Sequence, residues 1–556
     1  MKIFNKIIII CLALAVLPGC GDLFELEENL DNPNAVGAEN AELDLVMNNA
    51  MLRFVEFVDE ASDETLPYVR LAAMTGGNRY DNQDSPASFD LIWFNGYAEV
   101  LPDLNLVIET ADAGGFGLHS GAARIMKAYV MMTFVDLFGD VPFTQAFQGT
   151  DNFNPSTDSG AEVYAASLAM LDQAITDLSG EGLVSMANDL FYNNNVANWM
   201  SLANTLKLRY HLNTRLVNTD AAASINAILS AGNIIEGSTS DFQFQYGNNR
   251  STPDARHPYY SDGYEDGGPT WYLSNNYMWL LFGEKDTEDP RLRYYFLRQD
   301  CNEFDEDAFT LDCNTKPYPS HWPSNLPFCT ASGVSGDPDD LYQGYWGRDH
   351  GNDDGIPPDD LKRTAWGVYP AGGKFDNDFC SGVSNGGTDG LRGAGIQPII
   401  LSSFVYFMRA EAALTLGTSD DARTMLEMGV AESISKVMAF GAADADPAFM
   451  PDSTQVQDYV DEVLSLFDSG SDDDKLDVVM KEYFLALQGN GVEAYNGYRR
   501  TCKPSGLQPT LATDSGDFAR SLWYPANSVN SNSSISQKAG VSQPVFWDTN
   551  ATGCAQ

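Results

Sequence analysis

The densest set of side chains that could bind a metal ion lies between Gly347 and Asp360. Calcium takes about six to eight oxygen ligands from carboxylates, amides and backbone carbonyls. In this segment, such oxygens could come from Asp349, Asn352, Asp353, Asp354 and Asp359. The spacing lacks the alternating ligands and the distal glutamate of an EF-hand. We therefore predict a calcium site here, with a solvated acidic loop as the alternative.

A second group of candidate binding residues is aromatic. Rings are crowded between His257 and Trp279, and the glycines and proline before Trp271 indicate a loop rather than a packed helix. Exposed rings on a loop mark a binding surface, so we predict that Tyr264 and Trp271 contact ligand. Trp346 and Trp366 lie on either side of the acidic segment. We expect these two rings to form a further wall of the same site.

Catalytic signatures are sparse. None of the five histidines stands in an HExxH arrangement, and the chain has no phosphate-binding glycine loop. A pair of carboxylates of the kind that glycosidases use stays open, with Asp353 or Asp354 as candidates. We expect a binding protein rather than an enzyme, and a glycan hydrolase is the alternative.

The elements that must position these residues are helices. Apolar residues recur at three and four positions over 164–178, 404–412 and 476–487, as on one face of a helix. The run 125–137 is apolar nearly all round, which predicts a helix buried on most sides. Further helices are expected near 42–59, 92–112, 196–216, 272–282 and 420–439. The predicted fold class is mainly α, with helix pairs stacked as an irregular helical-hairpin array.

Two stretches break this periodicity. Residues 299–398 are rich in glycine, proline, aspartate and aromatic residues, and a loop region of this size is usually functional. The end of the chain, from about residue 500, is also irregular and is expected to wrap the helical body. We predict one domain over residues 20–556, with its helical body at about 40–298 and 399–490.

The cysteines indicate an exported protein with disulfides. Of the eight cysteines, Cys11 and Cys20 belong to the N-terminal region discussed below. The other six, an even number, are Cys301, Cys313, Cys329, Cys380, Cys502 and Cys554. Their spacings do not match a zinc site, so structural disulfides are expected. Several pairings are compatible with the sequence, and Cys301 with Cys313 is the most local one.

The balance of charge excludes one class of partner. The chain carries 78 acidic against 32 basic residues, a net charge of −46. A field of this sign repels phosphate backbones, so we expect no nucleic-acid binding. It also disfavours a polyanionic substrate unless a metal intervenes.

The first residues resemble a bacterial lipoprotein signal. Lys2 and Lys6 precede an apolar run that is too short to span a bilayer. The sequence Leu-Pro-Gly-Cys then ends at Cys20, the expected lipidation site, with residues 1–19 as the signal peptide. An ordinary signal peptide is the alternative. The acidic residues that follow resemble an export signal of bacterial surface lipoproteins, so a lipid anchor on the outer face of the outer membrane is expected.

Seven segments spread along the chain resemble those of one family. They include the helix and turn that run from Ala122 to Phe143, with Asp136-Leu137-Phe138-Gly139-Asp140 at the turn. The others are Asn32-Pro33-Asn34, the segment Asn198–Arg209, Asp289-Pro290-Arg291-Leu292, the segment Phe407–Ala412, and the two C-terminal segments Ala494–Thr501 and Arg520–Pro525. Together they resemble the SusD/RagB family of nutrient-binding outer-membrane lipoproteins.

This resemblance implies a fold and a function. Stacked tetratricopeptide-like helix pairs would carry an irregular ligand-binding half. The protein would capture an oligosaccharide or a peptide and act as the lid of a SusC-like TonB-dependent outer-membrane transporter. A protein-binding scaffold of helical hairpins is a further alternative.

The resemblance also suggests site residues. An aromatic residue and the polar loop before it contribute to the ligand site in the family. In this chain they correspond to Arg79, Tyr80, Asp81, Trp93 and Asn95. Packing between helices is the alternative role of Trp93, and it is the role that we expect for Tyr97.

Overall fold

The computed structural model describes residues 42–75, 79–265, 268–301, 319–323, 326, 344–352, 363–380, 382–384 and 386–554. Helices dominate these residues. In the first half they are α2 (Leu43–Thr65), α3 (Asp90–Phe94), a π-helix (Asn95–Val100), α4 (Leu101–Gly114), α5 (Gly117–Phe138), α6 (Gly160–Leu178), α7 (Val196–Asn213), α8 (Ala221–Ala231), α9 (Pro258–Gly263), α10 (Asn275–Phe282) and α11 (Leu292–Tyr295). In the second half they are α12 (Ser402–Leu416), α13 (Ala422–Gly441), α14 (Ser453–Ser469), α15 (Asp472–Ala486), α16 (Gly491–Thr501) and α17 (Ala526–Ser531).

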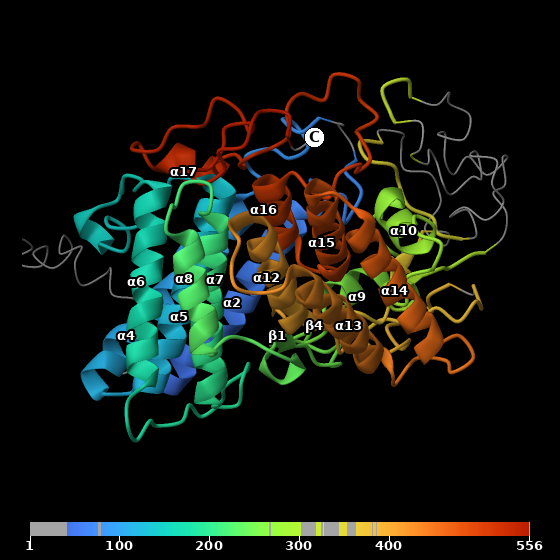
Figure 1. Cartoon of the computed structure of the whole chain (residues 1–556). Coiled ribbons are helices and arrows are strands. Elements are labelled where there is room, and N and C mark those ends of the chain that lie inside the picture. The colour runs from blue at the N-terminus through green and yellow to red at the C-terminus, as the bar shows by residue number, and fades with distance from the viewer. Residues whose placement is uncertain are drawn as a thin grey trace, which may run out of the picture.

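The helices pack as successive pairs. α5 lies between α4 and α6, α6 packs on α7, and α7 packs on α8. In the second half, α12 packs on α13 and α15, and α14 lies against both α13 and α15. Figure 1 shows α4–α8 on one side of the molecule, α12–α15 beside them, and the C-terminal segment in red along one end. This arrangement buries the apolar faces of both sets of helices against one another.

Helix α5 is the most deeply buried of these elements. Every residue from Ala128 to Phe138 is buried, as the continuous apolar run predicts. The helix ends at Gly139, whose φ of 80° is open to glycine and strained for other residues. Asp140 then accepts the backbone amide of Gly160 at 2.8 Å, which fixes the entry into α6.

The buried carboxylate of Asp136, near the end of α5, joins distant parts of the chain. One oxygen accepts the hydroxyl of Tyr164 on α6 and the indole N–H of Trp547, which lies 2.9 Å away. The other accepts Arg209 of α7 and Asn496 of α16, each at 2.9 Å. The conspicuous acidic turn of the sequence therefore has an architectural role at this position.

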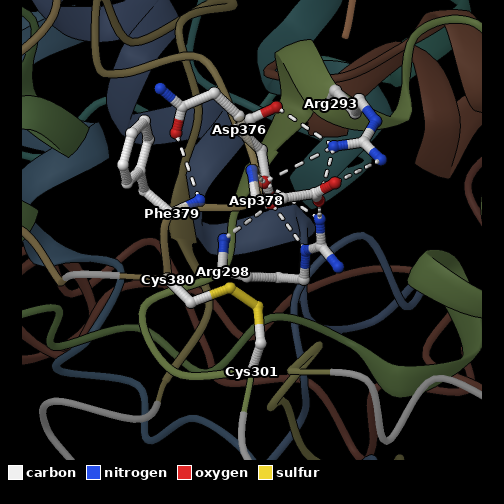
Figure 2. Close-up of a disulfide and its surroundings, with 8 residues drawn as sticks. Arg293, Arg298, Cys301, Asp376, Asp378, Phe379 and Cys380 are labelled. Atoms are coloured by element: carbon white, nitrogen blue, oxygen red, sulfur yellow. Dashed lines mark hydrogen bonds and ion pairs between the residues drawn. A yellow bond between two sulfur atoms is a disulfide. The ribbon is translucent and has the colours of Figure 1, made fainter.

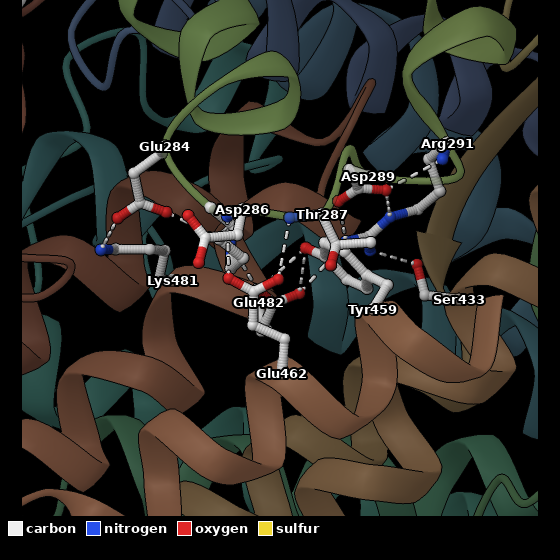
Figure 3. A network of polar contacts seen from close by, with 11 residues as sticks. Glu284, Asp286, Thr287, Asp289, Arg291, Ser433, Tyr459, Glu462, Lys481 and Glu482 are labelled. Atoms are coloured by element: carbon white, nitrogen blue, oxygen red, sulfur yellow. Dashed lines mark hydrogen bonds and ion pairs between the residues drawn. The ribbon is translucent and has the colours of Figure 1, made fainter. Parts of the chain in front are cut away.

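A second polar network fastens the chain between α10 and α11 to the later helices (Figure 3). Arg291 forms an ion pair with Asp289 at 2.6 Å and donates to Ser433 of α13 at 2.9 Å. It also reaches Glu482 of α15 at 3.2 Å, and the hydroxyl of Tyr459 on α14 donates to the same carboxylate. These contacts tie three helices to one loop in the interior, where hydrogen bonds are strong because water is excluded.

Strands are few and short. β1 (Phe242–Gln245) pairs antiparallel with β4 (Ile396–Ile400), so the chain before α9 is joined to the start of α12. β2 (Phe296–Leu297) pairs antiparallel with β3 (Ala365–Trp366). Both pairs attach the irregular middle of the chain to the helical body.

A disulfide and a set of ion pairs hold the same region (Figure 2). Cys301 is bonded to Cys380, with Cα atoms 5.4 Å apart. Beside it, Arg298 forms an ion pair with Asp376 at 2.7 Å, and Arg293 pairs with Asp378 at the same distance. A disulfide between two cysteines that are far apart in the sequence stabilises the fold by restricting the unfolded chain.

The cysteine pairing corrects the most local prediction. Cys301 pairs with Cys380 and not with Cys313, and the ion pair of Arg298 with Asp376 joins the same two chain segments. Cys502 is bonded to Cys554, which secures the end of the chain. Cys313 and Cys329 lie outside the described residues.

Most predicted helices are confirmed. The segments expected near 42–59, 196–216, 272–282 and 420–439 correspond to α2, α7, α10 and α13. The expectation near 92–112 corresponds to three helical pieces in series, α3, the π-helix and α4. Helices α8, α14 and α16 and the short α9, α11 and α17 were not predicted, and α9 lies in the stretch before Trp271 that was expected to be a loop. Asp452 caps the start of α14 through the amides of Thr454 and Gln455. In the described part of the chain, no helix combines the length and apolarity needed to cross a membrane.

Candidate functional site: an aromatic groove and an acidic hollow

An open groove of about 420 Å³ lies where α3, the loop after α5 and the C-terminal segment meet. The aromatic side chains that line it are Trp93, Phe94, Tyr97, Phe147 and Phe153, and we call it the aromatic groove. Three of these rings are open to solvent, with exposed fractions of 53% for Phe94, 46% for Phe147 and 73% for Phe153. Exposed rings gathered around a concave surface are typical of a ligand site.

The groove is built on the π-helix. The chain passes from α3 into Asn95–Val100 and on into α4 without a break. Turns of this kind are frequent at functional sites, because the extra residue redirects the side chains around it. Gly96 allows the turn to approach α5, since a Cβ at this position would collide with the ring of Phe134. Trp93 and Tyr97 then lie side by side, with ring centroids 4.8 Å apart.

Packing holds these two rings in place. Trp93 contacts Phe138 of α5 and Tyr524 of the C-terminal segment edge to face, at centroid distances of 5.5 and 6.4 Å. The hydroxyl of Tyr97 donates to the carbonyl of Pro142 at 2.6 Å. Rings that are fixed before a ligand arrives cost little conformational entropy on binding.

The polar side chains of the lining come from the segment around α17. Its lining residues are Asn527, Ser528, Ser531 and Asn532. The backbone amide of Asn527 donates to Asp90 of α3 at 2.8 Å, and the side chain of Asn532 donates to the carbonyl of Pro155 at 2.8 Å. Hydroxyl and amide groups in a groove with exposed rings suit a sugar, whose faces are apolar and whose rim carries hydroxyl groups.

A second hollow, of about 340 Å³, lies beside the C-terminal half of α2. Its acidic lining residues are Glu60, Asp63, Glu64 and Asp84, and Trp271 and Tyr272 complete the wall. We call it the acidic hollow. Asp63 accepts the hydroxyl of Tyr259, so part of its charge is engaged within the protein.

Burial and mutual repulsion raise the pKa values of these carboxyl groups. Removal from water raises the pKa of Glu64 to about 8, and the neighbouring Asp84 and Glu60 add to the effect. Burial, with the neighbouring Glu60 and Glu56, raises the pKa of Asp59, five residues earlier on α2, to about 7. Near neutral pH the acidic hollow therefore changes its charge within a narrow pH range.

This perturbation predicts a pH-dependent stability. Lowering the pH from 8 to 6.5 protonates Glu64 in the folded state only, because its raised pKa lies above that of the unfolded chain. Stability from this group is present at low pH and is lost as the pH rises through about 8. The gain on acidification should thus be smaller by about 1–2 kcal/mol in Glu64→Gln than in the wild type. Urea unfolding at several pH values measures this difference.

An exposed residue supplies the control. Glu181 lies on the surface, and Glu181→Gln should leave the slope of stability against pH unchanged. A Glu64→Gln variant with the wild-type slope would show that the acidic hollow does not hold its carboxyl groups protonated.

Comparison with known proteins decides the family. A family described as starch-binding and associating with the outer membrane matches residues 36–310. The description of SusD and RagB outer-membrane lipoproteins matches residues 397–552. The chain belongs to the SusD/RagB family. Members of this family are binding proteins and not enzymes, as expected from the sequence.

Solved structures of SusD/RagB-like proteins share the fold over nearly the whole chain. A SusD/RagB family protein from Bacteroides thetaiotaomicron is 18% identical with a TM-score of 0.66, over 92% of this chain and 100% of that one. A chitin-binding protein is also 18% identical, with a TM-score of 0.64 and the same coverage of both chains. A chitin-binding SusD homologue from Flavobacterium johnsoniae is 16% identical, with a TM-score of 0.61 over 91% of this chain and 99% of that one. No curated protein sequence matches the chain.

These likenesses confirm the fold class. The SusD-like fold carries tetratricopeptide-like helical repeats, and the stacked pairs from α4 to α8 and from α12 to α15 are of this type. The family consists of outer-membrane lipoproteins. Cys20 and the signal segment lie outside the described residues, so lipidation of this chain stays a prediction.

Two of the ligand residues predicted from the sequence line hollows. Trp93 lies in the aromatic groove and Trp271 in the acidic hollow. Asn95 is buried within the π-helix. Arg79 and Asp81 pair with each other at 3.2 Å on the surface, and the residues that line the two hollows do not include them.

Four other suggested aromatic residues lie in the interior, which corrects their assignment. Tyr80, Tyr264, Trp346 and Trp366 are all buried. The hydroxyl of Tyr80 accepts Arg70 at 2.7 Å, and that of Tyr264 donates to the carbonyl of Trp366 at 2.7 Å. Trp366 stacks on Tyr259 with centroids 4.5 Å apart. Rings packed in this way have no free face for a sugar.

The predicted calcium ligands are only partly described. Asp349 is buried and accepts Gln508 at 2.7 Å, and Asn352 accepts Arg348 at 2.7 Å. Asp353, Asp354 and Asp359 lie outside the described residues. Within the described ranges, no three acidic, histidine or cysteine side chains are grouped to hold a metal ion. Calcium binding by the full segment stays a prediction.

Three rings of the aromatic groove were not predicted from the sequence. Phe94 follows Trp93 directly, and Phe147 and Phe153 stand in a polar loop of glutamine, glycine, threonine, aspartate and asparagine. Large apolar residues in such a loop cannot pack against their own neighbours, which is the signal that could have identified them. Tyr97 packs between helices as expected and also lines the groove.

Proposed function

We propose that the protein binds a neutral oligosaccharide in the aromatic groove and delivers it to an outer-membrane transporter. The observation that carries this proposal is the set of exposed rings in a groove whose lining also includes asparagine and serine residues. Aromatic faces pack against the C–H surface of a sugar, and polar groups opposite them orient its hydroxyl groups. Two of the similar solved structures are named chitin-binding, which favours a glycan over a peptide as ligand.

The proposed partner is a SusC-like TonB-dependent transporter. One matching family is described as associating with the outer membrane, which supports a membrane-bound partner. A lipid anchor at Cys20 would hold the protein at the cell exterior, where it captures the oligosaccharide and closes over the transporter. The net charge of −46 favours a neutral sugar polymer over a polyanionic one.

Calorimetric titration of the chain from residue 21 onward tests the binding. The probes are malto-, chito- and xylo-oligosaccharides and a mixture of short peptides, each with and without calcium. Saturable binding of one oligosaccharide class, with no cleavage products after incubation, is the expected result.

The alternative outcomes separate the other hypotheses. Binding of peptides alone would replace the glycan by a peptide nutrient, and release of shorter sugars would identify a hydrolase. A requirement for calcium would support the metal site predicted at 349–359. Failure of every probe would overturn the proposal that the isolated protein captures a nutrient.

A further inference from the structure

A third hollow, of about 460 Å³, lies beside the aromatic groove. Its polar lining residues are Asp140, Ser521, Ser536, Gln537, Lys538 and Gln543. Rings of Phe138, Tyr524 and Phe546 complete the wall, and we call it the lysine hollow. Unlike the other two hollows, the lysine hollow has a buried amine, that of Lys538, among its lining residues.

The amine of Lys538 is buried without a partner. Among the residues that the structure describes, no hydrogen-bond acceptor and no carboxylate reaches its Nζ atom. The amine lies over the ring of Tyr524, 4.9 Å from the centroid. Loss of water around an isolated ammonium is costly, and burial lowers the pKa of Lys538 to about 7.

The charged groups around the amine do not neutralise it. Arg499 of α16 also lowers the pKa of Lys538, and Asp140 of the turn after α5 opposes this effect. Arg499 itself donates to the carbonyls of Arg520 and Asp136, at 2.6 and 2.7 Å, and forms no ion pair with a described carboxylate. Two neighbouring cations without a carboxylate partner are unusual in a chain with so many acidic residues.

The lysine hollow adjoins the aromatic groove through shared chain segments. Pro525 and Ile535 line the groove, while their neighbours Tyr524 and Ser536 line the lysine hollow. The ring of Tyr524 touches Trp93 on one side and lies under the amine of Lys538 on the other. The aromatic groove and the lysine hollow therefore come together at Tyr524.

We infer that the lysine hollow binds an acidic substituent, a carboxylate or a sulfate, on the glycan held in the aromatic groove, with Lys538 as the group that recognises it. This inference rests on the proposed glycan binding and adds one acidic substituent to the otherwise neutral oligosaccharide proposed above. An anion would supply the counter-charge that Lys538 lacks, whereas a neutral hydroxyl group would not. The Nζ atom is covered in this structure, so the flexible side chain must rotate toward the ligand.

One acidic group per ligand is consistent with the charge of the whole protein. The acidic field repels a polyanion, but salt screens exposed charges beyond about 8 Å at physiological ionic strength. A single carboxylate close to Lys538 and Arg499 is thus attracted locally. The inferred ligand is a mainly neutral glycan with acidic side groups.

The test compares two disaccharides that differ at one carboxyl group, which is charged in one of them and neutral in the other. One is a disaccharide with a single glucuronate residue, and the other is its methyl ester. Titrated at pH 6, where Lys538 is protonated, the wild type should bind the acid at least about ten-fold more tightly than the ester. The preference should shrink at pH 8, because the amine of the free protein loses its proton around pH 7.

Substitutions at Lys538 assign the preference to this residue. Lys538→Met keeps the length of the side chain and removes an unpaired buried charge, so it should fold and should bind acid and ester equally. Lys538→Arg should retain part of the preference. Equal binding of both disaccharides by the wild type, or an unchanged preference in Lys538→Met, would overturn the inference.

A neutral oligosaccharide separates this inference from the proposed function. Binding of the neutral oligosaccharides by wild type and Lys538→Met alike would leave the groove proposal standing whatever the acidic disaccharide does. If the wild type does not bind any neutral oligosaccharide, that result would count against the proposed function itself.

Discussion

Replacing Asp136 by alanine is expected to destabilise the protein by about 3–5 kcal/mol, the cost of removing one partner of a buried ion pair. Its carboxylate is fully buried and accepts Tyr164, Trp547, Arg209 and Asn496. These donors cannot turn to water, so each would be left without an acceptor in the interior. The measurement is the free energy of unfolding in urea.

The large loss of stability expected for Asp136→Ala comes mainly from the guanidinium group of Arg209. Arg209 is buried and is held between Asp136, at 2.9 Å, and Glu493, at 2.5 Å. Removal of one carboxylate leaves a buried cation with half of its counter-charge. Asp136→Asn keeps the shape but presents an amide N–H₂ group to donors, so it should also destabilise the protein, by a smaller amount.

A surface ion pair on the same helices is the matched control. Asp172 of α6 pairs with Lys207 of α7 at 2.6 Å, but the aspartate side chain is 59% exposed. Asp172→Ala should cost no more than about 1 kcal/mol, because water and salt screen such pairs. Similar losses for Asp136→Ala and Asp172→Ala would refute the architectural role of the buried carboxylate.

Replacing Trp93 by alanine is expected to weaken oligosaccharide binding by about ten- to a hundred-fold, equivalent to ~1.4–2.7 kcal/mol. Its ring lines the aromatic groove and is held by Phe138 and Tyr524, so a sugar would meet a preformed flat surface. Calorimetric titration with the oligosaccharide selected from the panel measures the change in Kd.

Trp93 also stabilises the fold, and a second variant separates the two effects. Phe153 lines the same groove, but 73% of it is exposed. Phe153→Ala should therefore weaken binding several-fold without changing the unfolding temperature. Phe379, 72% exposed and not among the residues lining the groove, is the control, and Phe379→Ala should leave Kd unchanged. If Trp93→Ala and Phe153→Ala both bind the oligosaccharide with the wild-type Kd, the ligand binds outside the aromatic groove.

Local pattern determined much of the helical architecture. The run 125–137 predicted a helix buried on most sides, and α5 is that helix, because a helix that is apolar nearly all round is stable only inside other elements. The same reasoning located α2, α7 and α13 to within a few residues at their starts, although α2 extends to Thr65. Helical periodicity is a short-range property, so one sequence is enough to show it.

Tertiary structure decided which aromatic residues face a ligand. Tyr80, Tyr264, Trp346 and Trp366 have the composition of a binding loop around them, yet all four are buried. Their environment comes from partners far along the chain: Tyr264, for example, donates to the carbonyl of residue 366. A loop that is rich in glycine and rings can equally be exposed or folded into a core, and local pattern does not distinguish the two.

The aromatic groove itself depends on three segments that are distant in sequence. Trp93 and Tyr97 come from α3 and the π-helix, Phe147 and Phe153 from the loop after α5, and the polar wall from 525–535. The unpaired amine of Lys538 is likewise defined by Arg499 and Asp140 rather than by its neighbours in sequence. The sequence alone predicted most of the long helices, the charge and the resemblance to the SusD/RagB family. The groove and the hollows arise only when long-range packing brings these segments together, because burial and electrostatic environment are properties of the folded chain and not of any one segment.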